Sequence, residues 1–341
     1  MSDPPLNELA LGAWLGANLP GFELPFRLTK FPSGQSNPTY KISSASGEYV
    51  LRRKPFGHLL PSAHAVDREY RLLSALHPLG YPVPEPLALC SDPDVIGAMF
   101  YVMELAKGRP YADGALPEFD PATRGQMYDQ LIDTLADLHA IDPDAAELED
   151  FGKPGNYFER QVARWTRQYR DSETDYLPDM ERLIAFLPET LPAQSRTSIV
   201  HGDYRIDNVV FDGDGTLTAV LDWELATLGD PVADFSYLAM QWVMPADGGA
   251  ALSGLDLDAL GIPSLDAITR RYSERSGVPV AGQLDWYFAY NLFRLAGIVQ
   301  GIKKRLADGS ASHANAAEIA AKVPTLARAA WSFAQQAQVG A

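Results

Sequence analysis

The stretch Ile199–Leu238, IVHGDYRIDNVVFDGDGTLTAVLDWELATLGDPVADFSYL, decides the fold of this 341-residue chain. Its first part carries an acidic residue, Asp203, with Arg205 two residues and Asn208 five residues further on. A second acidic residue, Asp222, follows Asn208 after fourteen positions, inside the tetrapeptide LDWE. The stretch therefore holds a carboxylate, a cation, an amide and a second carboxylate at fixed spacings between short apolar runs.

Between Asn208 and Asp222 the sequence predicts a β-hairpin. Residues 209–211 (VVF) and 217–221 (LTAVL) are short runs of strand-forming residues, and DGDG at 212–215 is a turn signal. Because a hairpin folds back on itself, the residue before its first strand and the residue after its second emerge at the same end. Asn208 and Asp222 are thus expected to meet, and Mg²⁺ favours such oxygen ligands together with substrate phosphates.

The order of these side chains matches the requirements of phosphoryl transfer. Asp203 is placed to accept the proton of an acceptor hydroxyl, and Arg205 to offset the charge of the phosphate. Asn208 and Asp222 are the expected ligands of the magnesium ion. The sequence therefore predicts magnesium-dependent phosphoryl transfer, with Asp203 and Arg205 as the catalytic residues.

Three motifs in the same stretch resemble those of a known family. HGDYRIDN at 201–208 resembles the catalytic loop of the aminoglycoside phosphotransferase and protein-kinase-like group, and LDWE at 221–224 resembles the metal-binding D-F-G element. GDPVADFSYL at 229–238 is similar to the G-D-P-x-x-D-L segment of small-molecule kinases, with Phe235 in place of leucine. The resemblance implies an α+β, bilobal protein-kinase-like fold with ATP as the donor. Its small N-terminal lobe would hold an antiparallel sheet and one main helix, and its larger C-terminal lobe would be mostly helical.

The resemblance also implies that a nucleotide-binding lobe lies upstream. The loop FPSGQSNPTY at 31–40 stands where a phosphate-covering loop is expected, although it carries one glycine and is not a Walker A motif. Its small polar residues leave backbone N–H groups available for phosphate oxygens. The candidate nucleotide contacts in this loop are Gly34, Gln35, Ser36 and Asn37.

The strand that follows, YVLRRKP at 49–55, corresponds to the kinase strand that carries the phosphate-binding lysine. By that correspondence Val50 lies over the adenine and Arg52 stands at the lysine position, since both point to one face at period two. Lys54 shares that face but precedes a proline near the strand end, and Arg53 is also explained as a charged strand edge. The choice among the three cations stays open.

The partner of this cation is expected on a helix over residues 63–76, whose apolar residues recur at helical spacing. The resemblance points to Glu69, in the middle of that helix, as the ion-pair partner. The alternative is a solvated glutamate that pairs with a neighbour on the same helix face.

The family's hinge, whose backbone contacts the adenine edge, falls on three residues of the chain. These residues are Met103, Glu104 and Leu105. A linker with glycine and proline follows at 106–110. The two lobes are accordingly expected at 1–105 and 106–341.

The rest of the chain is predicted to be helical, with the main helices at 121–140, 157–169, 265–275 and 286–305. Arginines recur along or near one side of the second helix, at positions 160, 164, 167 and 170. They form either a solvated face or a contact surface for an anionic acceptor.

Four further polar residues have open roles. Arg294 interrupts the apolar run of the last helix, where a polar group is costly to bury unless it is paired. It either lines the acceptor pocket or forms an internal salt bridge. Glu224 assists the metal or lies on the surface, and Asp230 and Asp234 are expected to brace the catalytic loop rather than touch substrate.

The composition is that of an acidic chain with one cysteine. The formal net charge of −16 argues against a nucleic-acid partner, because neutralising phosphates needs a basic face. No apolar run reaches the ~18 residues of a membrane span, and no secretory signal is recognised at the N-terminus. Cys90 alone can form no internal disulfide, which fits a cytoplasmic location. Nothing in the sequence indicates an oligomeric state.

A finer resemblance extends from Phe31 to Arg305 and includes GQSNPTY, YVLRRKP, DREYRLLSAL and NYFERQVARWTRQY. These segments look like the kinase domains of acyl-CoA-dehydrogenase fusion proteins, which implies a hydroxyacyl-CoA as the acceptor. The predicted function is an ATP- and Mg²⁺-dependent phosphotransferase that acts on an alcohol group of a small molecule. Two alternatives stay open: a kinase for an aminoglycoside or other amino alcohol, and a nucleotide-binding pseudokinase without catalysis.

Overall fold

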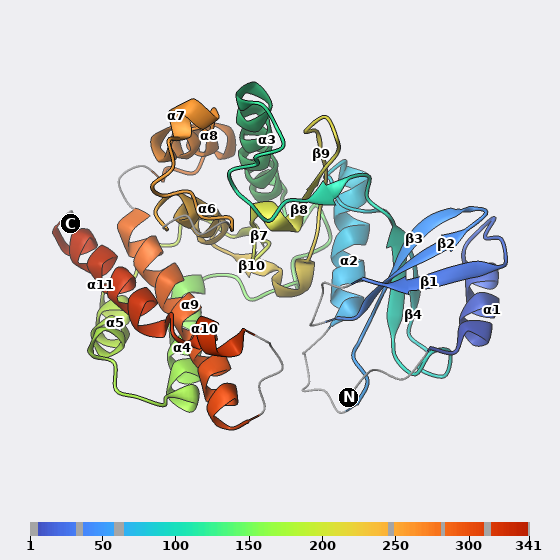
Figure 1. The fold of residues 1–341 in the computed structure, drawn as a ribbon, viewed down its shortest axis with the longest axis horizontal. Coiled ribbons are helices and arrows are strands. Elements are labelled where there is room, and N and C mark those ends of the chain that lie inside the picture. The colour runs from blue at the N-terminus through green and yellow to red at the C-terminus, as the bar shows by residue number, and fades with distance from the viewer. Residues whose placement is uncertain are drawn as a thin grey trace. The chain divides into compact units, whose positions relative to one another are not determined.

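The computed structural model describes residues 6–31, 37–57, 65–244, 249–280, 284–309 and 315–339. The chain divides into two compact units, which Figure 1 shows as a ribbon. Unit 1 consists of Met1–Ala112, Asp144–Glu149 and Ile206–Ala226, and unit 2 of Asp113–Pro143, Asp150–Arg205 and Thr227–Ala341. The stretch Ile199–Leu238 thus contributes to both units.

A five-stranded sheet forms the centre of unit 1. Its strands are β1 (Phe26–Lys30), β2 (Thr39–Ser44), β3 (Gly47–Arg53), β4 (Pro86–Cys90) and β5 (Phe100–Glu104). They lie in the order β1-β2-β3-β5-β4, and every neighbouring pair is antiparallel. Four of the five residues of β5 are buried, as its nearly unbroken apolar sequence predicts.

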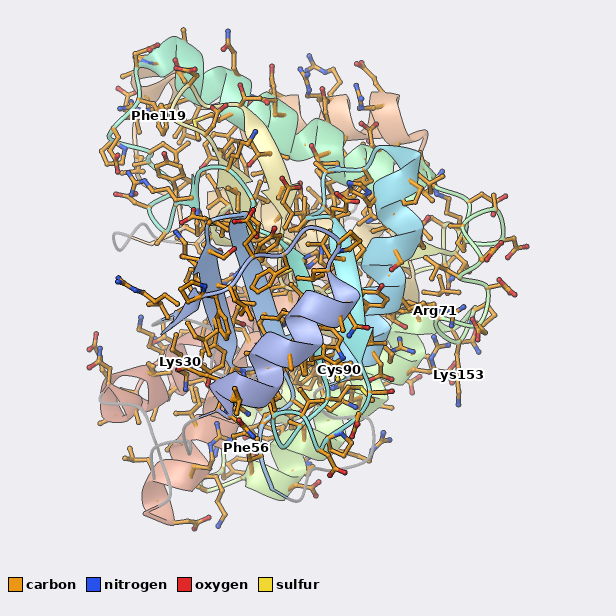
Figure 2. The ribbon with its side chains drawn as sticks, turned by 90° about the vertical axis from the view of Figure 1, so that its right-hand side faces the viewer. Lys30, Phe56, Arg71, Cys90, Phe119 and Lys153 are labelled. Carbon is orange, nitrogen blue, oxygen red and sulfur yellow. The ribbon has the colours of Figure 1, made fainter. Side chains whose placement is uncertain are left out.

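Helix α1 (Glu8–Asn18) lies across one side of this sheet, as Figure 2 shows. Its buried leucines share a core with Ile42 of β2 and Leu51 of β3. Helix α2 (Val66–Leu76) packs on β4 and β5 and begins three residues later than predicted. Since side chains alternate along a strand, Leu51 faces α1 while Arg52 is directed to the side of α2.

The predicted hairpin is confirmed in unit 1. Strands β8 (Val209–Phe211) and β9 (Leu217–Val220) pair antiparallel, and the short β6 (Arg109–Pro110) adds to β8. Single turns of 3-10 helix flank the hairpin: η2 (Ile206–Asn208) before it and η3 (Trp223–Leu225) after it. The N–H of Leu221 donates to the carbonyl of Asn208 at 2.8 Å, so the two ends of the hairpin meet.

Helices make up most of unit 2. They are α3 (Pro121–Ala140), α4 (Tyr157–Ser172), α5 (Pro178–Glu189), α6 (Val232–Ala239), α7 (Leu257–Leu260), α8 (Leu265–Ser276), α9 (Leu284–Ala307), α10 (Ala316–Ala320) and α11 (Val323–Val339). Strands β7 (Ser198–Val200) and β10 (Thr227–Gly229) form an antiparallel pair. Helix α9 packs against α4, α10 and α11, and Phe158 of α4 meets the rings of Trp286, Tyr287 and Tyr290 edge-on.

The predicted α+β fold is confirmed, with an antiparallel sheet in the N-terminal part followed by a mostly helical remainder. The predicted helix 121–140 has the observed bounds of α3, while α4, α8 and α9 extend by one to three residues beyond theirs. The division into lobes at residue 105 stays a prediction. In the described ranges, no helix is both long enough and apolar enough to cross a membrane.

Candidate functional site

Arg52 on β3 contacts three acidic side chains of unit 1. Its Nε lies 2.8 Å from a carboxylate oxygen of Glu69, and its Nη2 donates to Asp222, also at 2.8 Å. A longer contact of 3.7 Å reaches Glu224. Burial acts to lower the pKa of Arg52, but the charges of Glu69 and Asp222 raise it above its usual range. The guanidinium therefore stays cationic and links α2 to the end of the hairpin.

Glu69 is the predicted partner of this cation, and it is almost completely buried. Besides the pair with Arg52, its carboxylate accepts hydrogen bonds from Asn37 at 3.1 Å and from the Tyr101 hydroxyl at 3.0 Å. Burial raises the pKa of Glu69, while Arg52 and Tyr101 act to lower it. Glu69 is thus held in one orientation by groups from three different segments, which contradicts the alternative of a solvated helix glutamate.

The three cations of β3 and its end have different surroundings. Arg52 contacts Glu69 directly, with its Nε at 2.8 Å from the carboxylate. Arg53 is fully buried, with its guanidinium 3.8 Å from the ring centre of Phe56. Lys54 pairs with Asp67 at 3.0 Å. The geometry therefore favours Arg52 at the lysine position, and it shows that Arg53 is not a solvent-exposed strand edge.

Asp222 follows the hairpin in a left-handed backbone conformation, with φ of +66°. Such a conformation is uncommon for a residue other than glycine and is often found at functional sites. Its side chain is 39% exposed, with one carboxylate oxygen on Arg52. Asn208 reaches the same end of the hairpin through its backbone, as predicted. Within the described ranges, no cluster of three or more His, Cys, Asp or Glu is arranged to hold a metal.

The predicted adenine contacts lie on the neighbouring strands β3 and β5 and directly after β5. Val50 and Met103 are directly paired across β3 and β5, and both are buried. Glu104, the last residue of β5, is exposed, and its N–H donates to the Glu85 carbonyl at 2.9 Å. Leu105 follows it in a half-buried position. Their contact with a nucleotide stays a prediction.

The predicted phosphate-covering loop is described only at its end. Gly34, Gln35 and Ser36 lie outside the described residues. Asn37 is described and is completely buried. Its amide donates to Glu69, so the structure gives this residue a contact inside unit 1 that the sequence does not reveal.

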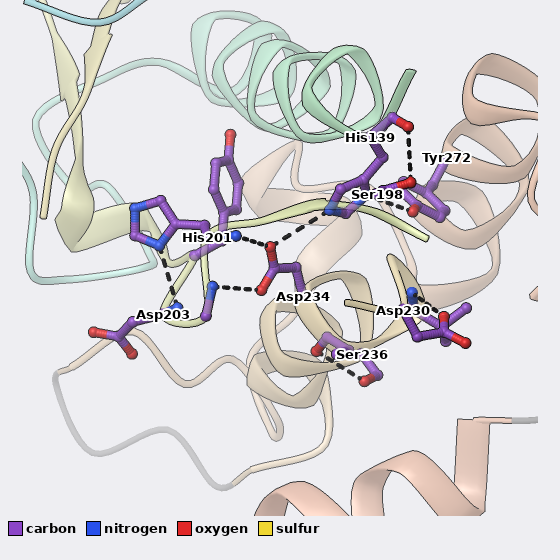
Figure 3. A network of polar contacts seen from close by, with 12 residues as sticks. His139, Ser198, His201, Asp203, Asp230, Asp234, Ser236 and Tyr272 are labelled. Atoms are coloured by element: carbon purple, nitrogen blue, oxygen red, sulfur yellow. Dashed lines mark hydrogen bonds and ion pairs between the residues drawn. The ribbon is translucent and has the colours of Figure 1, made fainter. Parts of the chain in front are cut away.

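In unit 2, strand β7 leads into the loop 201–205, which carries Asp203 and Arg205. Figure 3 shows the polar contacts behind this loop. The backbone N–H groups of His201 and Gly202 both donate to the carboxylate of Asp234, the latter at 2.8 Å. The N–H of Asp203 donates to Nδ1 of His201 at 3.2 Å. The predicted bracing role of Asp234 is therefore confirmed.

Asp234 also belongs to a buried network that reaches two helices. His139 of α3 lies with Nε2 3.4 Å from Asp234 and with Nδ1 2.7 Å from the Tyr272 hydroxyl of α8. Burial acts to raise the pKa of Asp234, but His139 and the hydrogen bonds to the loop 201–205 hold it below its usual range. The loop therefore rests on an ionised carboxylate that is fixed from behind.

Asp230 has a different role from the one predicted. Its carboxylate accepts from the N–H and the hydroxyl of Ser195, at 2.9 and 3.0 Å, and from the N–H of Val232. These partners lie before β7 and at the start of α6, rather than in the loop 201–205. Burial raises the pKa of Asp230, and these hydrogen bonds oppose that effect. Asp230 thus anchors the segment that leads into β7.

Asp203 and Arg205, the predicted catalytic pair, lie side by side in the loop. Nε of Arg205 is 3.6 Å from a carboxylate oxygen of Asp203, and both side chains are partly exposed. Tyr237 of α6 is a neighbour that the sequence prediction missed. Burial, and next the negative charge of Asp203, raise the pKa of its hydroxyl. Tyr237 lies one turn after Asp234 in the motif GDPVADFSYL, and that spacing is the signal that could have revealed it.

The arginines of α4 divide into two kinds. Arg160 donates to the carbonyls of Lys153 and Gly155, and Arg170 pairs with Glu181 and Glu173. Arg164 and Arg167 instead line an open pocket of about 500 Å³ between α4 and the end of α9. The other residues that line this pocket are Gln168, Asp171, Ser172, Gly301, Lys304 and Arg305. A strongly acidic chain thus has a mostly basic pocket on unit 2.

The fold is that of kinase-like phosphotransferases, with a sheet arginine paired with a helix glutamate and with a loop that carries Asp203 before a short hairpin. Residues 27–269 match the phosphotransferase enzyme family known as APH, and the chain belongs to this family. The predicted resemblance is thereby confirmed.

Comparison with known proteins supports this assignment. Acyl-CoA dehydrogenase family member 10 of Mus musculus is 44% identical over 330 residues, which cover 96% of this chain. The chain spans 31% of the length of that relative. The similarity is therefore to one part of that relative.

Solved structures share the fold of the chain, and two of them illustrate the likeness. A Ralstonia eutropha protein, provisionally assigned as an aminoglycoside phosphotransferase, has a TM-score of 0.89 and 42% identity, over 97% of this chain and 99% of its own. The aminoglycoside phosphotransferase APH(4)-Ia, solved as a variant with ADP and hygromycin B, has a TM-score of 0.62 and 18% identity. That likeness covers 96% of this chain and 98% of the other. At 18% identity it supports the fold alone.

Proposed function

We propose that this protein is an ATP- and Mg²⁺-dependent phosphotransferase that acts on a hydroxyl group of a small molecule. The observation that carries the proposal is the cluster in which one guanidinium, Arg52, contacts both Glu69 and Asp222. A cation oriented by a buried glutamate is what kinases use on the donor phosphates. A relative of the same fold, APH(4)-Ia, was solved with ADP, which supports an adenine nucleotide as the donor.

The donor nucleotide is assigned to unit 1. Arg52 would contact the phosphate oxygens and can do so with two parallel N–H groups, because its guanidinium is planar. Glu69, with its Asn37 and Tyr101 hydrogen bonds, keeps that guanidinium oriented. The apolar surface of Val50 and Met103, together with the backbone at 103–105, would receive the adenine.

Asn208 and Asp222 would hold the magnesium ion. The residues fit this ion, because one is a carboxylate that is 39% exposed and both offer hard oxygen donors at one end of the hairpin. When bound, the ion would neutralise charge on the transferred phosphoryl group. Arg52, which holds one oxygen of Asp222, keeps the carboxylate in place for this role.

Asp203 would orient the acceptor hydroxyl and take its proton. Its neighbour Arg205 would stabilise charge on the phosphoryl group in transit. Asp234 fixes the loop that carries both residues, because it accepts two backbone hydrogen bonds from that loop. The domain limits at residue 105 and a cytoplasmic location belong to the same proposal.

A hydroxyacyl-CoA is the acceptor that the basic pocket on unit 2 favours. Arg164, Arg167 and Lys304 line the basic pocket on unit 2, where they could receive the phosphates of a CoA group. The similarity to a member of the acyl-CoA dehydrogenase family points to the same class of molecule. An aminoglycoside, which is cationic, would instead be repelled by this pocket.

The test combines the protein, Mg-ATP and three panels of acceptors: hydroxyacyl-CoAs, small hydroxylated metabolites and aminoglycosides. We expect ADP release that depends on an acceptor, together with a phosphorylated product found by mass spectrometry. Asp203→Ala is expected to lower turnover by about 10²- to 10⁴-fold, since it removes the proton acceptor. Asp214→Ala is the control, because Asp214 is an exposed acid in the hairpin turn of the same stretch.

Two results would count against the proposal. Acceptor-dependent turnover that survives Asp203→Ala would remove the assigned base. Nucleotide binding without turnover on any panel would favour the pseudokinase alternative, for which the absent lysine and the glycine-poor loop 31–40 argue.

A further inference from the structure

Arg294 lies in the middle of α9, within the buried part of that helix. Its side chain is buried, with 9% of its surface exposed, and its Nη2 donates to the carbonyl of Gly202 at 2.7 Å. The guanidinium also lies near the rings of Trp165 and Tyr237, at 5.5 and 4.9 Å from their centres. Aromatic rings thus surround a cation whose hydrogen bond goes to the loop 201–205.

Arg294 has no ion-pair partner in the part of the chain that the structure describes. Its buried Nε also lacks a hydrogen-bond partner among these residues. The internal salt bridge, one of the two roles expected for Arg294, is therefore not formed in this part of the chain. Burial acts to lower the pKa of Arg294, whereas nearby groups, Asp203 among them, raise it above its usual range. Removing a guanidinium from water without a paired carboxylate is costly. Stability alone does not explain an arginine here.

With the hydrogen bond from Arg294, both the N–H and the carbonyl of Gly202 have a side-chain partner. The N–H of Gly202 donates to Asp234 at 2.8 Å, and the carbonyl of Gly202 accepts from Arg294. Gly202 has φ of +84°, a left-handed conformation that glycine adopts without strain. Its carbonyl belongs to the peptide bond that continues into Asp203, so rotation of this peptide would turn the Asp203 backbone.

Tyr237 provides a second connection between Arg294 and Asp203. Its ring lies 4.9 Å from the guanidinium carbon of Arg294. Burial is the first cause that raises the pKa of the Tyr237 hydroxyl, and both the charge of Asp203 and a hydrogen bond to that carboxylate add to it. The ring that packs on Arg294 therefore also contacts the carboxylate of the proposed base.

We propose that Arg294 is a positioning residue for Asp203: it holds the Gly202 carbonyl and the Tyr237 ring, and thereby sets the orientation of the Asp203 carboxylate. The carboxylate of Asp234 accepts hydrogen bonds from two N–H groups of the loop 201–205, and Arg294 donates to a carbonyl of the same loop. This inference rests on the proposed role of Asp203 as the base. It adds a residue of α9, 91 positions further along the chain, to the machinery of the loop.

The first experiment measures backbone amide hydrogen exchange in the full-length protein. Arg294→Met keeps much of the side-chain volume but removes the donor and the charge. The hydrogen bond from the charged Arg294 stabilises the loop that contains Gly202. We expect its loss to speed hydrogen exchange of the amides at 201–203 by about 10- to 100-fold. Arg294→Lys retains the charge and a donor, so its exchange rates should lie closer to those of the wild type.

Gln300→Met is the matched control, because Gln300 is a buried polar residue on the same helix. Its Nε2 donates to the Ser172 carbonyl at 2.8 Å, away from the loop 201–205. We expect this variant to leave exchange at 201–203 unchanged. Unchanged exchange in Arg294→Met, or equal acceleration in Gln300→Met, would overturn the positioning role.

The second experiment separates positioning from nucleotide binding. With an acceptor that the wild type phosphorylates, Arg294→Met is expected to lower kcat by about tenfold or more, while the KM for ATP stays unchanged. Arg294→Lys should recover part of kcat. A raised KM for ATP with unchanged kcat would contradict the inference. If the wild type transfers no phosphate, the proposed function fails, and the exchange measurement still decides whether Arg294 holds the loop.

Discussion

Replacing Arg52 with methionine tests the buried ion pair at the centre of unit 1. The change removes the cation that lies 2.8 Å from Glu69, while the hydrogen bonds from Asn37 and Tyr101 remain. Breaking a buried pair by removing one partner costs about 3–5 kcal/mol, because the other charge is left uncompensated. We expect a loss of this size in the free energy of unfolding at about pH 8, where the carboxylate would have to stay ionised.

The loss should become smaller as the pH falls. Burial raises the pKa of Glu69, and Arg52 opposes that effect, so the pKa rises further in Arg52→Met. A carboxyl whose pKa is higher in the folded than in the unfolded state favours folding below its unfolded pKa, about 4.3 for glutamate. That contribution is lost as the pH rises through the folded pKa. The difference between wild type and variant is therefore expected to be smaller at about pH 5 than at about pH 8.

Urea unfolding at both pH values, combined with a double-mutant cycle, measures the effect. Glu69→Gln removes the orphaned charge with little change of shape, so Arg52→Met/Glu69→Gln should recover most of the loss. Lys41→Met is the control, because the pair of Lys41 with Glu48 is partly exposed, and ion pairs at the surface contribute about 0–1 kcal/mol. Equal losses at both pH values, together with additive effects of the two single changes, would refute the reasoning.

Three further predictions follow from the geometry. Asp234→Asn should make the melting temperature depend less on pH in the acid range, as measured by thermal unfolding. The pKa of Asp234 is held low in the folded protein, so its ionised carboxylate stabilises the fold above the unfolded pKa of about 3.9. That stabilisation is lost as the pH falls through the folded pKa. Gly108→Ala should cost about 1–3 kcal/mol in urea unfolding, because φ is +112° and a Cβ would lie 2.1 Å from a main-chain oxygen of β8. Arg164→Gln/Arg167→Gln should raise the KM for a hydroxyacyl-CoA by about tenfold or more in steady-state assays, and Arg170→Gln should not.

The stretch Ile199–Leu238 could be interpreted from the sequence because its structure is local. Turn residues between two short apolar runs specify the hairpin, and the hairpin brings Asn208 to the start of the LDWE segment. Helical periodicity likewise predicts α2 and α3 to within a few residues. The choice of Glu69 depended on family resemblance, and the structure supports it through direct contact with Arg52.

Contacts between distant segments could not be predicted, because no local pattern encodes them. Arg294 and Gly202 are 92 residues apart, and nothing in the apolar sequence around Arg294 identifies its acceptor. Asn37 was assigned to the nucleotide because of its place in a loop, whereas its amide contacts Glu69. Asp230 and Asp234 occur in one motif, but they have different partners. Asp230 accepts a hydrogen bond from Ser195, and Asp234 accepts one from Gly202.

The division of unit 1 into separated segments has a consequence for synthesis on the ribosome. The N–H of Val220 donates to the Pro82 carbonyl at 2.7 Å, and the rings of Trp223 and Tyr81 are 5.9 Å apart. The late segment of unit 1 that makes these contacts is complete only when residue 226 has been made, 114 residues after Ala112. At about 5–20 residues per second, this delay is roughly 6 to 23 s. During that time a nascent chain holds all five strands of the sheet but lacks the segment that packs on Tyr81 and Pro82, so we expect chaperones to bind it.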